Sequence, residues 1–205
     1  MYHPGPYKRI FILSLFVSIS LTACSGGGTP IKYYMIDPVR STGPSGDSSN
    51  QLSIEIMDVN VPQYLERFNL VTRGNENQLF LSEFHQWGDN FRKNLLRTMA
   101  RNISVKLGTN DIGTPINRMM SVPDYRIQVH IEQFERNYDG RVVLVGRWQV
   151  RKLGPDTVPV THEAKLSSTI MFAMDDYDNI VNDMRNLFGE FSDLIADSIL
   201  AGDAP

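Results

Sequence analysis

The feature that most constrains the fold of this chain is a pair of strand-like runs on either side of Asp139-Gly140. Along the first run apolar and polar residues alternate, which is the pattern of a strand with one buried face. The apolar positions of that run are Tyr125, Ile127, Val129 and Ile131. The second run extends from Arg141 to Lys152. Asp-Gly between two such runs predicts a β-hairpin with a two-residue type I′ turn, since that turn needs positive φ at both central residues.

A two-residue turn also fixes which residues of the two strands face each other. The predicted pairs are Val129 with Val150, Ile131 with Trp148, and Glu132 with Arg147. Apolar residues then meet on one face and opposite charges meet on the other, which supports the register. Trp148 is therefore expected in the hydrophobic core.

Shorter strands and two helices are expected on either side of this hairpin. The expected strands cover residues 31–36, 52–61 with a bulge near Met57-Asp58, a hairpin of 70–73 with 78–81, and 160–172. The expected helices run from Asp89 to about Leu107, ending at Gly108, and from Asp176 to about Leu200. Residues 109–123 are expected to form a loop. This order predicts an α+β fold, with an antiparallel β-sheet and two main α-helices packed on one face.

The N-terminal sequence predicts a secretory signal rather than a membrane span. Lys8-Arg9 precedes an apolar run from Ile10 to Leu21, which is shorter than the ~20 residues that a spanning helix needs. The run leads into Leu21-Thr22-Ala23-Cys24, and Cys24 is the only cysteine of the chain. This stretch resembles the lipobox of bacterial lipoproteins, in which the cysteine is acylated and the signal is cut before it. The alternative is an ordinary cleavage site with a chance cysteine.

The lipobox interpretation divides the chain into three parts. Residues 1–23 are expected to be a lipoprotein signal peptide, residues 24–30 a lipidated tether, and residues 31–205 a single domain. The chain has 20 basic and 23 acidic residues, and loss of the signal would remove Lys8 and Arg9 but no acidic residue. A mildly acidic chain without a basic run does not suggest a nucleic-acid binder. One cysteine allows no intrachain disulfide, so stability must come from the core.

No catalytic or metal-binding pattern stands out in the sequence. The histidines of the expected domain are His85, His130 and His162, and no two are spaced as neighbouring metal ligands on a helix would be. The G-x-S-x-G turn of α/β-hydrolases is absent, and Gly26-Gly27-Gly28 belongs to the tether rather than to a phosphate loop. We therefore expect no enzyme activity, no metal and no cofactor other than the covalent lipid on Cys24.

Several short stretches, in order, resemble the auxiliary lipoprotein family of ABC-type transport systems. Tyr33-Tyr34 follows the cysteine closely, Val59 to Leu65 has the sequence V-N-V-P-Q-Y-L, and Trp87 stands just before the first helix. Tyr138-Asp139-Gly140 is then followed by Val143, Gly146 and Trp148. One departure is Asn90, where relatives often carry proline at the helix start, and it affects only the expected helix boundary.

The resemblance implies an outer-membrane lipoprotein that faces the periplasm, and Ser25 after the cysteine agrees with that sorting. Its partners would be an MCE-domain protein and inner-membrane transport components. The system would move phospholipid or other hydrophobic molecules between the two membranes, with this lipoprotein as a docking and structural part. Assembly with further copies of itself is a further possibility.

A different class of function is a periplasmic carrier that binds a small apolar ligand between the sheet and the helices. A deep pocket lined by the helix residues Phe91 and Phe188 would favour a carrier. A packed core with an apolar patch on the outside would favour docking. An envelope hydrolase would need a convergent acid, base and nucleophile that the sequence does not indicate.

The predicted hairpin register also suggests where such a docking patch lies. Near the turn it pairs Phe134 with Val145 and Arg136 with Val143, on the face that the helices are not expected to cover. Phe134, Val143 and Val145 are therefore the expected contact to the MCE-domain partner or to a neighbouring copy. The alternative is that the loop at 109–123 folds over these residues.

Overall fold

The computed structural model describes residues 28–39, 52–75, 77–118 and 121–202. The chain divides into two units, residues 1–30 and 31–205, and the description below concerns the second. Cys24, the expected signal peptide and most of the expected tether lie outside the described residues. Both the acylation of Cys24 and the cleavage before it therefore stay predictions.

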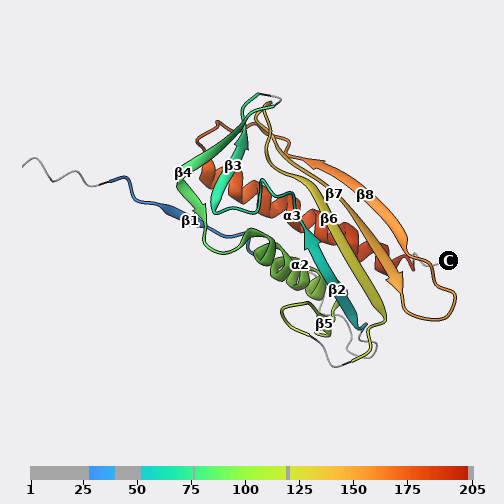
Figure 1. The fold of residues 1–205 in the computed structure, drawn as a ribbon. Coiled ribbons are helices and arrows are strands. Elements are labelled where there is room, and N and C mark those ends of the chain that lie inside the picture. The colour runs from blue at the N-terminus through green and yellow to red at the C-terminus, as the bar shows by residue number, and fades with distance from the viewer. Residues whose placement is uncertain (1–27, 40–51, 76, 119–120, 203–205) are drawn as a thin grey trace, which may run out of the picture. The chain divides into compact units, whose positions relative to one another are not determined.

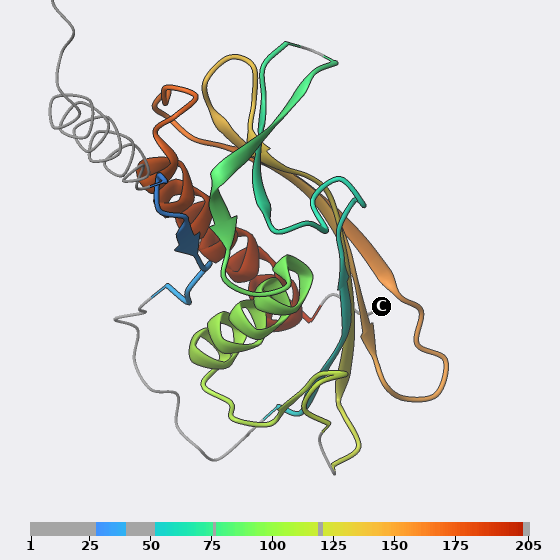
Figure 2. The same ribbon diagram turned by 60° about the vertical axis from the view of Figure 1, so that its left-hand side comes forward.

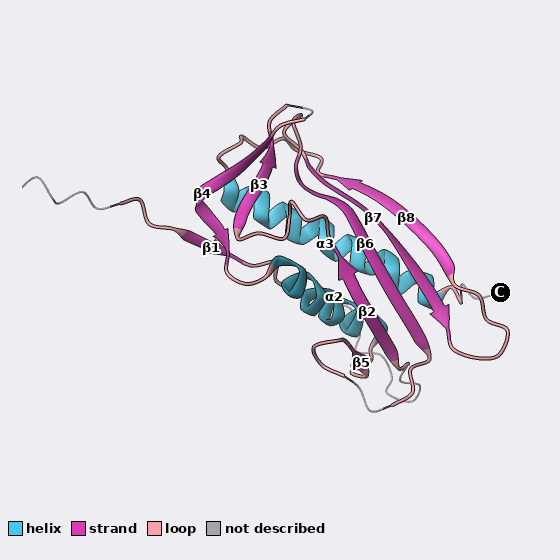
Figure 3. Cartoon of the chain, in the orientation of Figure 1, coloured by secondary structure: helices cyan, strands magenta, loops and turns pink. Residues whose placement is uncertain are grey.

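The second unit combines one curved sheet with two long helices (Figures 1 and 3). Both helices lie on the same side of the sheet, which curves around them as a half-barrel (Figure 2). The predicted α+β class is confirmed. The elements are β1 (Lys32–Tyr34), β2 (Ile54–Asn60), β3 (Asn69–Arg73), β4 (Leu79–Trp87), α2 (Phe91–Leu107), β5 (Ile112–Gly113), β6 (Tyr125–Arg136), β7 (Val142–Lys152), β8 (Val160–Ser167) and α3 (Tyr177–Leu200).

The sheet is mixed rather than purely antiparallel as predicted. The pairs β3–β4, β6–β7 and β7–β8 are antiparallel. The pairs β1–β4, β2–β5, β2–β6 and β3–β6 are parallel. β2 and β6 can run in the same direction because the chain between them includes the helix α2, and a parallel pair needs such a long connection.

The β6–β7 hairpin exists, but its turn is longer than predicted. Asn137 N donates to Arg141 O at 2.6 Å, and Gly140 N donates to Asn137 O at 3.0 Å. Gly140 has φ of 89°, whereas Asp139 has no positive φ. This geometry is a three-residue turn with glycine in the left-handed position, and it shifts the register by one residue.

A β-bulge between Ile131 and Gln133 shifts the register by one residue more. The predicted pairs are therefore wrong: Trp148 faces Val129, Arg147 faces His130, and Ile131 faces Gly146. Beyond the bulge the total shift is two residues, and a shift of two keeps each side chain on its predicted face. The predicted burial of Trp148 is accordingly confirmed, at 5% exposure.

Most of the shorter elements lie close to their predicted ranges. The β2 strand carries the expected bulge between Ile56 and Asp58, and β3 and β4 form the expected hairpin. Helix α2 ends at Gly108 as predicted, with φ of 66°. Its N-cap is Asn90 rather than Asp89, because the Asn90 side chain accepts from Lys93 N at 3.0 Å. Three further corrections concern the strand ends. β4 continues beyond the expected 78–81 to Trp87, β5 lies inside the expected loop, and β8 ends at Ser167 rather than at Phe172.

A row of aromatic rings fills the space between the sheet and the helices. Trp87 stacks on Phe91 with ring centroids 4.4 Å apart, and Phe134 lies 6.0 Å from Phe91 and 5.8 Å from Phe188. All four side chains are buried. The core is therefore continuous from β4 through α2 and β6 to α3.

Candidate docking surface

Possible metal ligands do not cluster among the described residues. Within them no group of three or more His, Cys, Asp or Glu side chains lies close enough to hold a metal ion. His85 stacks on Tyr177 at 4.2 Å, and His162 stacks on Trp148 at 5.3 Å. Among the helices that the structure describes, none combines the length and the apolar character needed to cross a bilayer.

A small-ligand carrier, the alternative function, would need a pocket lined by Phe91 and Phe188. The ring of Phe134 instead packs against both side chains, with its centroid 6.0 Å from Phe91 and 5.8 Å from Phe188. Close packing of this kind leaves the two side chains in contact with protein rather than with a ligand. The core between the helices and the sheet therefore favours a docking protein over a carrier.

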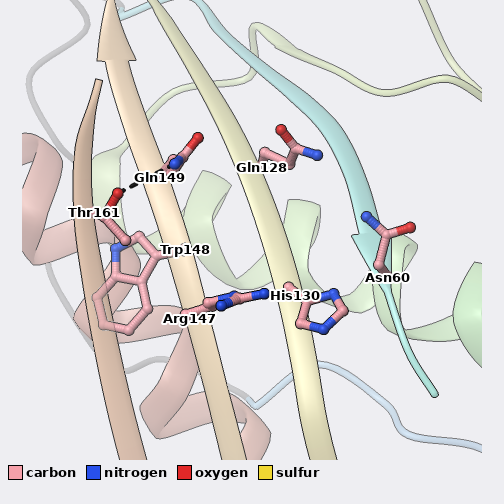
Figure 4. Close-up of a pocket in the computed structure, with 7 residues that line it drawn as sticks. All are labelled: Asn60, Gln128, His130, Arg147, Trp148, Gln149 and Thr161. Carbon is pink, nitrogen blue, oxygen red and sulfur yellow. Dashed lines mark hydrogen bonds between the residues drawn. The ribbon is translucent and has the colours of Figure 1, made fainter. Parts of the chain in front are cut away.

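A hollow on the other face of the sheet is open and polar (Figure 4). Its volume is about 270 Å³, and Gln149 Nε2 donates to Thr161 Oγ1 at 3.2 Å across its edge. Amide, imidazole and guanidinium groups do not suit an apolar ligand. The lining residues are Asn60, Gln128, His130, Arg147, Trp148, Gln149 and Thr161.

The patch predicted at Phe134, Val143 and Val145 is not an exposed surface. Phe134 is 0% exposed and Val143 is 4% exposed, whereas Val145 is half-buried. The register shift turns Phe134 toward the core, where it pairs with Leu144 instead of Val145. The expected partner contact therefore loses Phe134 and Val143, and of the three only Val145 stays a candidate.

The segment that covers Val143 is also not the loop at 109–123 that the alternative named. Val143 faces Glu135 across the hairpin, and Glu135 accepts hydrogen bonds from Tyr64 and Arg73. The outer face of the hairpin near its turn is thus covered from β3 and from the connection between β2 and β3. Residues 109–123 lie near β2 instead, where Ile112 and Gly113 pair with Ile54 and Glu55.

Exposed apolar side chains gather instead at the turn of this hairpin, on three segments that Arg136 holds together. Arg136 Nε donates to Phe172 O at 2.9 Å, and Arg136 Nη1 donates to Asn137 O at 3.1 Å and to Arg73 O at 3.4 Å. Phe172 N donates to Gly140 O at 2.7 Å. One buried guanidinium thereby joins the β3–β4 hairpin, the β6–β7 turn and the connection from β8 to α3, which meet at one end of the sheet in Figures 1 and 2.

We call four exposed apolar residues on these three segments the turn-end patch. Their side chains are 39–69% exposed, and they are Phe80, Tyr138, Ile170 and Met171. Two glycines allow the close approach of neighbouring side chains. A Cβ on Gly140 would lie 3.2 Å from Met171 Cβ, and a Cβ on Gly74 would lie 2.1 Å from Phe80 Cε2. Apolar side chains that gather on a surface in this way often mark a binding site.

A buried carboxylate stiffens the hairpin beneath the turn-end patch. The Glu135 side chain is 0% exposed and accepts from Tyr64 Oη at 2.8 Å, Arg73 Nε at 3.0 Å, Gln133 Nε2 at 3.0 Å and Phe134 N at 3.1 Å. Burial, together with the negative charge of Glu135, raises the pKa of the Tyr64 hydroxyl well above its usual range. Protein groups therefore supply the hydrogen bonds that the Glu135 carboxylate would otherwise accept from water, as burial of an ion requires.

The sequence drew attention to part of this arrangement. Tyr64 and the turn Tyr138-Asp139-Gly140 belong to the stretches on which the family resemblance rests. The sequence does not indicate that Glu135 and Arg136 are buried, since charged residues in a strand usually point to solvent.

Comparison with known proteins agrees with the fold and with the resemblance. The chain is 24% identical over 143 residues to the intermembrane transport lipoprotein PqiC of Escherichia coli strain K12, covering 69% of this chain and 74% of that relative. The PqiC of Shigella flexneri matches to the same extent.

Two crystal structures share the fold at low sequence identity. A structure described only as an uncharacterized protein has a TM-score of 0.65 at 20% identity, covering 83% of this chain and 99% of that chain. Protein XCC0632 from Xanthomonas campestris has a TM-score of 0.54 at 10% identity, covering 82% of this chain and 91% of its own. The model of the ABC-type transport auxiliary lipoprotein component family matches residues 34–196, so this chain belongs to that family and is a lipoprotein component of a transport system.

Proposed function

We propose that this protein docks, from a lipid anchor at Cys24 on the periplasmic face of the outer membrane, onto an MCE-domain protein and inner-membrane transport components. The assembly would move phospholipid or other hydrophobic molecules between the two membranes. Family membership supports the general role, and the printed name of the PqiC relatives supports intermembrane transport. The docking role, the partner and the cargo are the parts that we propose.

The observation that carries the docking role is the turn-end patch on a rigid base. Its four apolar residues are 39–69% exposed at one end of the sheet. Beneath them Arg136 and Glu135 fix the three segments by hydrogen bonds rather than leaving them as independent loops. A preorganised apolar surface loses little conformational entropy on binding, which favours a protein contact there.

The test of docking is copurification from native membranes of the full chain with Tyr138→Asp and Met171→Asp. We expect loss of the MCE-domain partner, because two charges would be buried in an apolar contact. Val158→Asp is the matched control, since Val158 is 60% exposed on the β7–β8 connection, outside the patch. Retention of the partner by the double variant, at the level of the control, would remove the turn-end patch from the interface.

The test of the anchor is Cys24→Ala, followed by membrane fractionation. We expect the variant to be released or left unprocessed, because each buried acyl CH₂ contributes ~0.8 kcal/mol and several chains are needed for stable anchoring. Normal processing together with retention in the outer-membrane fraction would contradict lipidation at this residue.

A further inference from the structure

Strand β1 presents two different faces, and its inner face is bound to α3. Lys32 Nζ lies 3.0 Å from Asp178 Oδ2, and Tyr34 Oη donates to Asp178 Oδ1 at 2.7 Å. These hydrogen bonds, first that from Tyr34 and then that from Lys32, hold the pKa of Asp178 below its usual range. On the neighbouring strand β4, His85 points the same way and stacks on Tyr177. The inner face of β1 and β4 is therefore fixed to the first turn of α3.

Four apolar residues of β4, β1 and the residues that flank β1 point to the opposite side, together with the polar Gln86. Tyr33 pairs with Gln86 in the parallel β1–β4 ladder, which places Ile31 beside Phe84 on the same outer face. Met35 continues this face and lies over Gly88, with its sulfur 3.5 Å from where a Cβ would stand. We call these four residues the β1 face; Ile31 is 43% exposed, Tyr33 64%, Met35 38% and Phe84 40%.

The position of the β1 face in the chain limits how far it can lie from the membrane. Ile31 is seven residues after Cys24 in the sequence. Even a fully extended chain spans at most about 3.6 Å per residue, so a lipid on Cys24 would keep Ile31 within about 25 Å of the anchored residue. This step rests on the proposed lipidation of Cys24.

We infer that the β1 face rests on the lipid surface of the membrane that holds the anchor. Tyrosine suits the boundary between headgroups and acyl chains, because its ring is apolar and its hydroxyl is polar, and aliphatic neighbours can enter the boundary beside it. A short tether also gives a high effective concentration, so a weak surface contact is populated once the lipid is inserted. Because the inner face of β1 is bound to α3, this contact orients the whole domain and not only the strand.

The experiment compares two tyrosines of similar exposure in the same molecule. The lipidated full chain, carrying a protease site inserted after Gly28, is reconstituted in vesicles of phosphatidylethanolamine and phosphatidylglycerol. Hydroxyl-radical oxidation is then measured by mass spectrometry before and after protease release. We expect Tyr33 and Phe84 to be oxidised about threefold more slowly on the vesicle than after release, as for side chains placed in the membrane interface. Tyr138, which is 53% exposed in the turn-end patch, is expected to change little.

Three results would overturn the inference. Equal oxidation of Tyr33 before and after release would mean that the β1 face is in water. An equal slowing of Tyr33 and Tyr138 would mean general shielding by the vesicle. Slowing that grows with the number of proteins per vesicle would assign the β1 face to a second copy of the chain instead of to lipid.

A pair of variants provides a second readout that does not depend on the tyrosine. In Tyr33→Glu with Phe84→Glu we expect Met35 to lose its protection from oxidation on the vesicle, whereas Val158→Glu keeps it. Continued protection of Met35 in the double variant would contradict the inference. The mass of the released N-terminal peptide reports acylation of Cys24 in the same sample, so a failed anchor and a failed surface contact are distinguishable.

Discussion

The β6–β7 hairpin has two halves that differ in how far their outer face is buried. In the base half, residues 125–131 with 146–152, buried residues alternate with exposed ones such as Arg126 and Gln149. In the tip half, residues 133–136 with 142–145, both faces are buried or half-buried, and Glu135 and Val143 lie on the outer one. The bulge between Ile131 and Gln133 separates the halves and keeps Ile131 and Phe134 on the same core face.

The comparison shows that the segments next to a strand determine whether its polar residues stay in water or need hydrogen bonds from protein groups. Beside the base half lies β2, which leaves the outer face in water, where Arg126 pairs with Glu55. Over the tip half lie Tyr64 and Arg73, which remove water from Glu135 and must replace it with hydrogen bonds. Surface ion pairs contribute little to stability, whereas a buried ion that loses its partners costs much. The following changes test this difference, from the largest expected effect to the smallest.

In the base half, the side chains on the core face are expected to contribute most of the stability. Trp148 is 5% exposed, its Nε1 donates to Ser198 Oγ at 3.1 Å, and its ring meets Phe191 edge-on at 5.3 Å. We expect Trp148→Ala to lower the free energy of unfolding by about 3–5 kcal/mol, measured by urea denaturation. Gln149→Ala, on the exposed face of the next position, is expected to stay within about 0.5 kcal/mol of the parent. Similar losses of unfolding free energy in the two variants would contradict the description of the base half as buried on one face only.

In the tip half the outer face carries stability as well. Glu135→Ala would remove the buried carboxylate that pairs with the Arg73 guanidinium at 2.9 Å. We expect a loss of about 3 kcal/mol in the free energy of unfolding, in the range found when a buried ion pair loses one partner. The control is Glu132→Ala, because Glu132 is 3.8 Å from Arg147 at an exposed site and such pairs contribute at most about 1 kcal/mol. A Glu135→Ala variant as stable as the Glu132→Ala variant would contradict the comparison.

The boundary between the halves depends on a glycine. A Cβ on Gly146 would lie 2.8 Å from Phe191 Cζ, and the Phe191 ring is fully buried against Trp148. We expect Gly146→Ala to cost about 1–3 kcal/mol through overpacking, seen as a lower denaturation midpoint. Gly154→Ala is the control, since its Cβ would lie 3.7 Å from Thr157 Cγ2, an ordinary contact. If Gly146→Ala and Gly154→Ala have the same denaturation midpoint, the packing of the Phe191 ring does not depend on the absence of a side chain at residue 146.

The sequence predicts the base half better than the tip half for a physical reason. Alternation of Tyr125, Ile127, Val129 and Ile131 reflects one buried face, and it survives any register shift of two residues. The helices α2 and α3 are predicted for a similar reason, because their apolar residues recur with the period of a helix. The α+β class and the burial of Trp148 follow from these local patterns alone.

The rest depends on contacts between distant parts of the chain. Asp139-Gly140 fits both a two-residue and a three-residue turn, because each places glycine at positive φ, so the register near the turn is not fixed by these two residues. The parallel pairing of β2 with β6 joins residues 70 or 71 positions apart, and the hydrogen bond from Tyr64 to Glu135 joins residues 71 positions apart. The turn-end patch could not be placed for the same reason, since Arg136 assembles it from three separate segments.

The smallest effect expected is also the one that isolates a single hydrogen bond of the tip half. Tyr64 Oη donates to the buried Glu135 carboxylate at 2.8 Å, so Tyr64→Phe is expected to cost about 1.5 kcal/mol at pH 8. Burial, then the charge of Glu135, raises the pKa of Tyr64 in the folded protein. A raised pKa means that the folded state favours the neutral phenol, so this stability is complete below about pH 10, the pKa of an unfolded tyrosine.

The stability difference between the parent and Tyr64→Phe is therefore expected to shrink as the pH rises above the unfolded pKa toward the raised folded one. Urea denaturation of both proteins at pH 8 and at about pH 11 measures that difference directly. Tyr138→Phe is the matched control, because Tyr138 is 53% exposed and loss of its hydroxyl is expected to leave the stability unchanged. A Tyr64→Phe difference that stays constant across this range would show that the contribution of the hydroxyl does not depend on the buried charge of Glu135.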